Sequence, residues 1–121
     1  GPPYKQLMGH PIKKGYHSDG GDITVINPWL NFSTIVTGKN LAGAQILGDQ
    51  TLTRQELMWL ATAANKWFIW EDDIGSIEAG NRADLVVLDR DWFSVPDTEI
   101  RGTKSLLTLV SGKTAHNDGI L

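Results

Sequence analysis

The sequence predicts an α/β fold, in a mixed α+β arrangement, on two main observations. Residues up to about 68 follow the order strand, glycine-rich loop, helix, helix. Residues from about 75 onward show short apolar runs separated by turn-forming residues, which is typical of strands. We therefore expect two segments, 1–74 and 75–121, that belong to different layers of a fold.

Composition narrows the classes of protein to which the chain can belong. Its 121 residues are enough for one domain with a core, and the net charge of -3 comes without a basic stripe, so we expect no nucleic-acid partner. No apolar stretch approaches the length of a bilayer span, so we expect no membrane association. The absence of Cys excludes a disulfide scaffold and thiolate metal ligands, and it suits a reducing compartment, so we expect a cytoplasmic location.

The first half begins with an expected strand over 11–17, which runs into the turn-forming sequence Ser-Asp-Gly-Gly-Asp. An extended segment that enters a polar, glycine-rich loop is a common position for functional residues in α/β proteins. The next expected element is a helix with Asn27 as its N-cap, Pro28 in its first turn and Gly38 as its C-terminal cap.

A second helix is predicted from about Arg54 to about Phe68. Thr53 and Glu56 form a capping-box pattern at its start, in which each side chain can bond the backbone N–H of the other residue. Apolar residues follow at helical spacing, so one face of this helix is expected to pack against the core.

The second half is predicted to contain short strands. The range 75–81 is expected to form a short strand and a tight turn, and the continuous apolar run 85–88 a strand buried on both faces. One helical turn is expected at 96–99. The strand 106–110 is expected to pair with 113–116 in a hairpin.

Four stretches carry a resemblance to a known family. The run 75–89, GSIEAGNRADLVVLD, resembles the C-terminal segment of metal-dependent amidohydrolases, which follows their last barrel helix. Residues 105–113 resemble the closing hairpin of those enzymes, 52–64 resembles their last helix, and His17-Ser18-Asp19-Gly20 resembles the Gly-Ser-Asp end of their eighth barrel strand. The branch that the chain resembles contains formamide deformylase-like and D-aminoacylase-like enzymes.

This resemblance implies a fold and an activity for the intact protein. Segment 1–74 would supply the eighth strand, the catalytic loop and the last helices of a TIM-like (β/α)8 barrel. Segment 75–121 would supply strands of the small composite β-sandwich. The implied reaction is hydrolysis of a C–N bond in a small amide, formamide or cyclic amide by a metal-activated water, with zinc as the expected metal.

The resemblance also implies that Asp19 is a catalytic residue and a metal ligand. A carboxylate suits both roles, because one oxygen can bind a hard cation while a spare lone pair accepts a proton. Without the resemblance, Asp19 reads as an ordinary turn residue. His17 stands where the family usually has a small residue; it could be a second ligand, although a half-buried structural His is the simpler expectation. His10 and His116 are expected to be exposed and without function.

The chain lacks most of what such a site needs. It contains no His-x-His pair, and a complete barrel takes about 250 residues. We therefore expect a C-terminal fragment that is inactive alone, holds no metal alone and has the remainder of the barrel as its partner. Unpaired strand edges would favour self-association. The alternative hypothesis is a stand-alone α+β binding or assembly module without catalysis.

Overall fold

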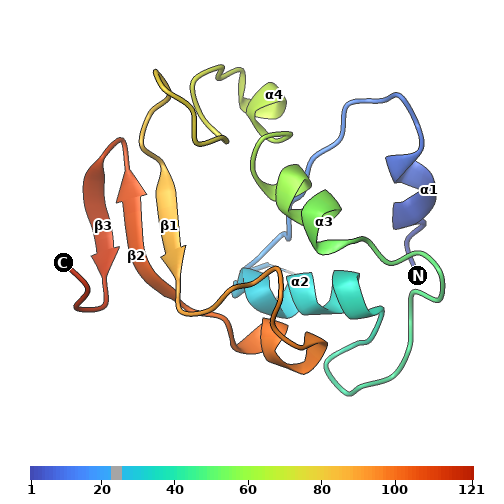
Figure 1. The fold of residues 1–121 in the computed structure, drawn as a ribbon. Helices are drawn as coiled ribbons and strands as arrows, with labels where there is room; N and C mark the ends of the chain where they lie inside the picture. The colour runs from blue at the N-terminus through green and yellow to red at the C-terminus, as the bar shows by residue number, and fades with distance from the viewer. Residues whose placement is uncertain (23–25) are drawn as a thin grey trace.

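The computed structural model describes residues 1–22 and 26–121, and it shows a mixed α/β chain. Helices gather on one side and three strands form a sheet on the other (Figure 1). Among the described residues, no helix is long and apolar enough to cross a membrane. In chain order the elements are α1 (Tyr4–Met8), α2 (Pro28–Thr37), α3 (Arg54–Ala61), α4 (Lys66–Ile69), β1 (Leu85–Leu88), the 3-10 helix η1 (Asp97–Gly102), β2 (Ser105–Val110) and β3 (Lys113–Asn117).

Helix α2 forms as the sequence predicts. The Asn27 side chain accepts a hydrogen bond from the backbone N–H of Trp29 at 3.0 Å, and Pro28 occupies the first turn. Gly38 ends the helix in the left-handed region, with φ of 74°. The inner face of α2 buries Phe32 and Ile35 in the core.

Helix α3 begins with the predicted capping box but ends earlier than predicted. The backbone N–H of Thr53 donates to the Glu56 carboxylate at 2.9 Å, and the N–H of Glu56 donates to the Thr53 hydroxyl at 3.1 Å. The helix ends at Ala61, so the prediction of one helix to Phe68 is wrong. The chain departs from helical geometry at Thr62, whose hydroxyl donates to the carbonyl of Met58 at 2.7 Å.

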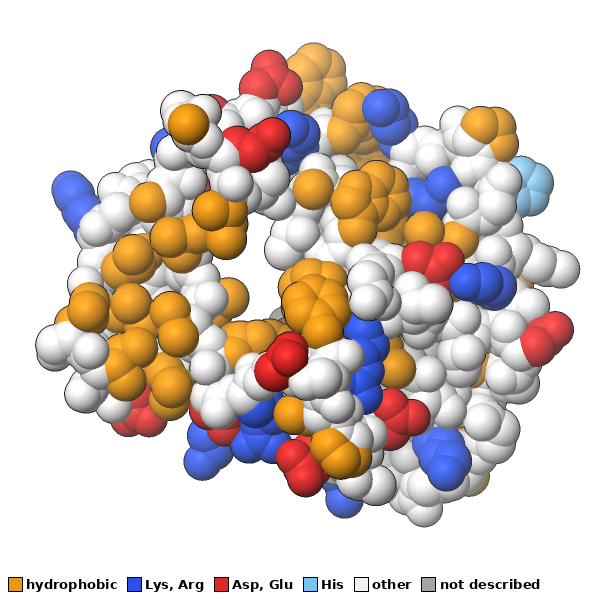
Figure 2. Space-filling view, viewed as in Figure 1, with side chains coloured by type: hydrophobic (Ala, Val, Ile, Leu, Met, Phe, Trp, Pro, Cys, Tyr) orange, Lys and Arg blue, Asp and Glu red, His pale blue; other side chains and the backbone are white. Residues whose placement is uncertain are grey.

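The three strands form one antiparallel sheet in the order β1-β2-β3, which confirms the strand at 85–88 and the predicted hairpin. The prediction that β1 is buried on both faces is wrong, since Val86 and Val87 are 50% and 43% exposed. Among the described residues no helix packs on the three strands as a second layer, although Leu88 touches the core and Leu107 is buried. Figure 2 shows hydrophobic side chains spread over the visible face of the sheet. The range 75–81 forms turns instead of the expected strand.

The expected strand at 11–17 is also absent, and this segment runs without strand pairing. The backbone N–H of Tyr16 donates to the carbonyl of Leu60 at the end of α3, at 3.2 Å. A parallel barrel strand needs hydrogen-bonding strands beside it, and the described residues supply none next to this segment.

The core joins the helices to the segment between β1 and β2. Trp92 is 1% exposed and Ile100 is fully buried. Arg54 holds this segment from α3: its guanidinium donates to the carbonyl of Trp92 at 2.7 Å and to the carbonyl of Val95. The buried core comprises Phe32, Ile35, Leu52, Leu57, Leu60, Ala64, Trp92 and Ile100.

An ion pair at the end of β1 predicts that the stability of the fold decreases at acidic pH. Arg90 donates to the Asp89 carboxylate at 2.7 Å and lowers the pKa of that carboxyl, and the backbone N–H of Lys104 adds to the effect. A carboxyl whose pKa is lower in the folded state stabilises the fold at pH values above its unfolded pKa of about 3.9. This stabilisation is lost as the pH falls from the unfolded pKa toward the lower folded pKa.

We therefore expect the melting temperature of the chain to fall more steeply between pH 4 and 2 than that of the Asp89→Asn variant. Thermal unfolding followed by circular dichroism between pH 7 and 2 measures this difference. Asp118→Asn, which changes an exposed carboxylate in the C-terminal turn, is the control. Parallel acid profiles for the protein and Asp89→Asn would contradict the expectation.

Candidate functional site

Asp19 lies in an exposed turn between the segment 11–17 and α2. Its backbone has φ of 49°, in the left-handed region, and its carbonyl accepts from the N–H of Asp22 at 3.3 Å. The Ser18 hydroxyl accepts from the N–H of Gly20 at 3.2 Å. The turn directs the Asp19 carboxylate outward, with its side chain 53% exposed.

His17 and Asp19 are brought together in this turn. The His17 Nδ1 atom lies 3.1 Å from the Asp19 Oδ1 atom, and the imidazole is 81% exposed. With Nδ1 protonated, the imidazole donates a hydrogen bond to the carboxylate and restrains its rotamer. The structure therefore places on one surface the two residues that sequence analysis singled out.

The segment before Asp19 is held by a residue that sequence analysis missed. The Asn65 side chain donates to the carbonyl of Tyr16 at 2.8 Å and accepts from its N–H at 3.1 Å. A Cβ atom on Gly15 would lie 2.1 Å from the Asn65 Oδ1 atom, so the close approach requires glycine. No sequence signal marked Asn65, because the capping box and apolar spacing placed it inside a continuous helix.

Tyr16 fixes the same segment against the core. Its ring meets Phe32 edge to face, with centroids 5.1 Å apart. Burial raises the pKa of the Tyr16 phenol, while the neighbouring side chains of Asn31 and Ser18 act in the opposite direction. The phenol therefore stays neutral near pH 7, and Tyr16 anchors the chain at the position directly before the exposed side chain of His17.

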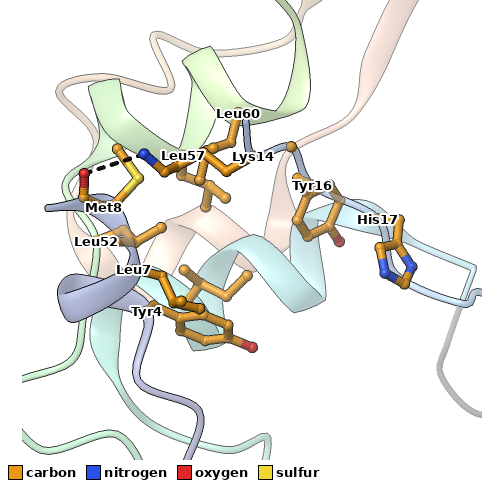
Figure 3. A pocket seen from close by; sticks show the side chains of 11 residues that line it. Tyr4, Leu7, Met8, Lys14, Tyr16, His17, Leu52, Leu57 and Leu60 are labelled. Carbon is orange, nitrogen blue, oxygen red and sulfur yellow. Dashed lines mark hydrogen bonds between the residues drawn. The ribbon is translucent and has the colours of Figure 1, made fainter. Parts of the chain in front are cut away.

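A cavity of about 360 Å³ opens beside this segment, between α1, α2 and α3 (Figure 3). His17 lies at one end of the lining, and Lys14 donates across it to the carbonyl of Met8 at 3.4 Å. The remaining walls are almost entirely apolar, and Asp19 is not part of them. The other lining residues are Tyr4, Leu7, Gly15, Tyr16, Ile35, Leu52, Leu57 and Leu60.

The donor atoms of the described residues do not complete a metal site. The described ranges 1–22 and 26–121 contain no group of three or more His, Cys, Asp or Glu side chains that could enclose an ion. A catalytic zinc takes three protein ligands, whereas this turn brings together two donor side chains, those of Asp19 and His17. His10 and His116 are both exposed, as expected, and the ring of His116 instead lies 3.0 Å from the carbonyl of Ser105.

Comparison with known proteins assigns the family. The model of the Amidohydrolase family matches residues 1–116. The chain belongs to the amidohydrolase family. A curated relative, the N-substituted formamide deformylase of Arthrobacter pascens, is 36% identical over 84 residues, which are 65% of this chain and 15% of that enzyme. The chain thus matches a small part of the relative's length, and no solved structure matches it. The resemblance to amidohydrolases that the sequence predicts is confirmed.

Proposed function

We propose that this amidohydrolase chain forms part of an enzyme that hydrolyses a C–N bond in an amide, a formamide or a cyclic amide. The observation that carries the proposal is the family match over residues 1–116 together with an exposed carboxylate, Asp19, in the turn that precedes α2. The relative named N-substituted formamide deformylase supports formamides as the first substrates to test.

Asp19 is the residue to which we assign the chemistry. Asp19, together with ligands from the remainder of the enzyme, would hold a divalent metal such as zinc, which would lower the pKa of the attacking water. The Asp19 carboxylate accepts the proton of the attacking water and delivers it to the leaving nitrogen. His17, 3.1 Å away, orients the carboxylate through its Nδ1 atom.

The fold of the intact enzyme is part of the same proposal. Segment 1–74 provides the last strand and helices of a (β/α)8 barrel, and segment 75–121 provides strands of a composite sandwich. Two features of the described residues support this assignment: 11–17 has no neighbouring strand, and both outer strands of the sheet, β1 and β3, have one unpaired edge. The remainder of the enzyme would pair with these strands and cover the exposed apolar face.

The proposal predicts that the intact enzyme is active and that this chain alone is not. After equilibrium dialysis against zinc, the chain alone should retain well below one equivalent, because its described residues gather no group of three donor side chains around one point. It should also release no formate from a simple N-substituted formamide. The intact enzyme should release formate and amine, lose this activity with a chelator and regain it with zinc.

Each arm can contradict a different part of the proposal. Stoichiometric zinc and turnover in the isolated chain would contradict the division of the site. Failure of the zinc-loaded intact enzyme to hydrolyse formamides, other amides and cyclic amides would contradict the assigned reaction.

A further inference from the structure

Helices α3 and α4 and the residue after them expose an unusual number of large apolar side chains. Trp70 is 93% exposed, and four neighbours in this region are about half exposed. The aromatic patch, as we define it, comprises Trp59, Trp67, Phe68, Ile69 and Trp70. Exposed apolar patches of this kind mark interaction surfaces, and Trp is enriched among residues that dominate binding.

The aromatic patch carries both a protrusion and hollows that could receive one. Trp70 follows α4 in the left-handed region, with φ of 60°, so its indole projects from the helix end. A hollow of about 260 Å³ lies beside it, lined by Lys66, Trp67, Trp70 and Asp72. It shares Lys66, Trp67 and Asp72 with a second hollow of about 590 Å³, whose wall includes Trp59 and the small Ala63.

Charges of both signs line the hollows, with Lys13, Lys14 and Lys66 against Asp72. Lys14 already donates to the carbonyl of His10 at 2.6 Å, and the Lys13 ammonium lies 5.9 Å from the centroid of the Trp67 ring, which leaves Lys66 and Asp72 to pair across a contact. Lys66 and Asp72 line both hollows, and in the described part of the chain neither forms an ion pair. The acids on either side of Asp72 are already neutralised, because Arg82 bonds Glu71 at 2.6 Å and Asp73 at 2.9 Å. Asp72 is therefore the acid of this run that remains available to an external cation.

A surface that carries a projecting side chain, a hollow and charges of both signs can bind a second copy of itself about a two-fold axis. We propose that a second copy of this chain covers the aromatic patch, with Trp70 of each copy in the hollow beside Trp67 of the other. The same two-fold contact sets Lys66 of each copy against Asp72 of the other. This interface goes beyond the proposed hydrolase function and requires neither metal nor substrate.

Sedimentation velocity over a concentration series of the whole chain tests this proposal. The protein should show a monomer–dimer equilibrium, and Trp70→Ala should raise the dissociation constant at least about tenfold, as expected for a central Trp. Ile77→Ala is the matched control, since Ile77 is 88% exposed but lies outside both hollows, and it should leave the constant unchanged. Circular dichroism checks that each variant is folded.

A charge exchange tests the two-fold geometry independently. Lys66→Glu and Asp72→Lys should each weaken the dimer, and the double variant should restore it, because both contacts are then reversed. A chain that stays monomeric would overturn the proposal, as would a dimer unaffected by Trp70→Ala. Dissociation by the sheet variant Val86→Thr/Val110→Thr, but not by Trp70→Ala, would assign the contact to the sheet and overturn the proposal as well.

Discussion

Replacing Asp19 with Asn in the intact enzyme is expected to lower kcat about 10³-fold, because the side chain then loses its role as proton acceptor. The amide keeps the size of the carboxylate and its carbonyl oxygen can still approach a cation, but it has no basic oxygen. The measurement is steady-state hydrolysis of an N-substituted formamide, with the zinc content of each preparation determined in parallel.

The zinc content separates the two roles proposed for Asp19. A loss of kcat with zinc retained indicates proton transfer, whereas loss of zinc together with activity indicates ligation. Asp22→Asn is the matched control, because Asp22 is an exposed acid in the same loop and its backbone only closes the turn on the Asp19 carbonyl. Near-normal kcat and full zinc in Asp19→Asn would remove Asp19 from the site.

Trp92→Ala is expected to lower the free energy of unfolding by about 3–5 kcal/mol, which is the range for truncating a buried aromatic residue. Trp92 is 1% exposed, packs edge to face on Phe32 at 5.8 Å between centroids, and lies 6.0 Å from the Arg54 guanidinium. Its removal would leave a cavity between α2 and the segment that follows β1. Urea unfolding monitored by circular dichroism measures the change.

The adjacent residue provides the control for Trp92. Phe93 is also aromatic but is 49% exposed, so Phe93→Ala should cost less than about 1 kcal/mol. Similar losses in both variants would show that the segment after β1 is not fixed to the helices by Trp92. The same result would contradict the observation that segments 1–74 and 75–121 share one hydrophobic core.

The local elements were predictable because short-range chemistry specifies them. The caps of α2 and the capping box of α3 depend on hydrogen bonds within four residues, and the hairpin depends on a two-residue turn. The break at Thr62 was missed because apolar spacing continues across it. The spacing also does not encode the contact that follows the break, in which the Asn65 side chain bonds Tyr16, a residue 49 positions away.

In the candidate site, too, features set by neighbouring residues were predictable, whereas features set by contacts between distant segments were not. Asp19 was identified through a family resemblance, and its pairing with His17 follows from a separation of two residues. The absence of strand structure at 11–17 and the exposure of Val86 and Val87 could not be read from apolar patterns. Those patterns report which side chains suit burial, not whether a neighbouring element is present to bury them.

By itself the sequence determined the family of this protein, the caps and turns of its helices and hairpin, and the carboxylate that we assign to catalysis. All of these reside in residues that are adjacent or nearly so. Only the tertiary structure decided which apolar residues are covered: Trp92 is enclosed between Arg54 and Phe32, while Trp70 projects into solvent. Burial depends on contacts between distant segments, and the amino-acid type of a residue does not specify its neighbours.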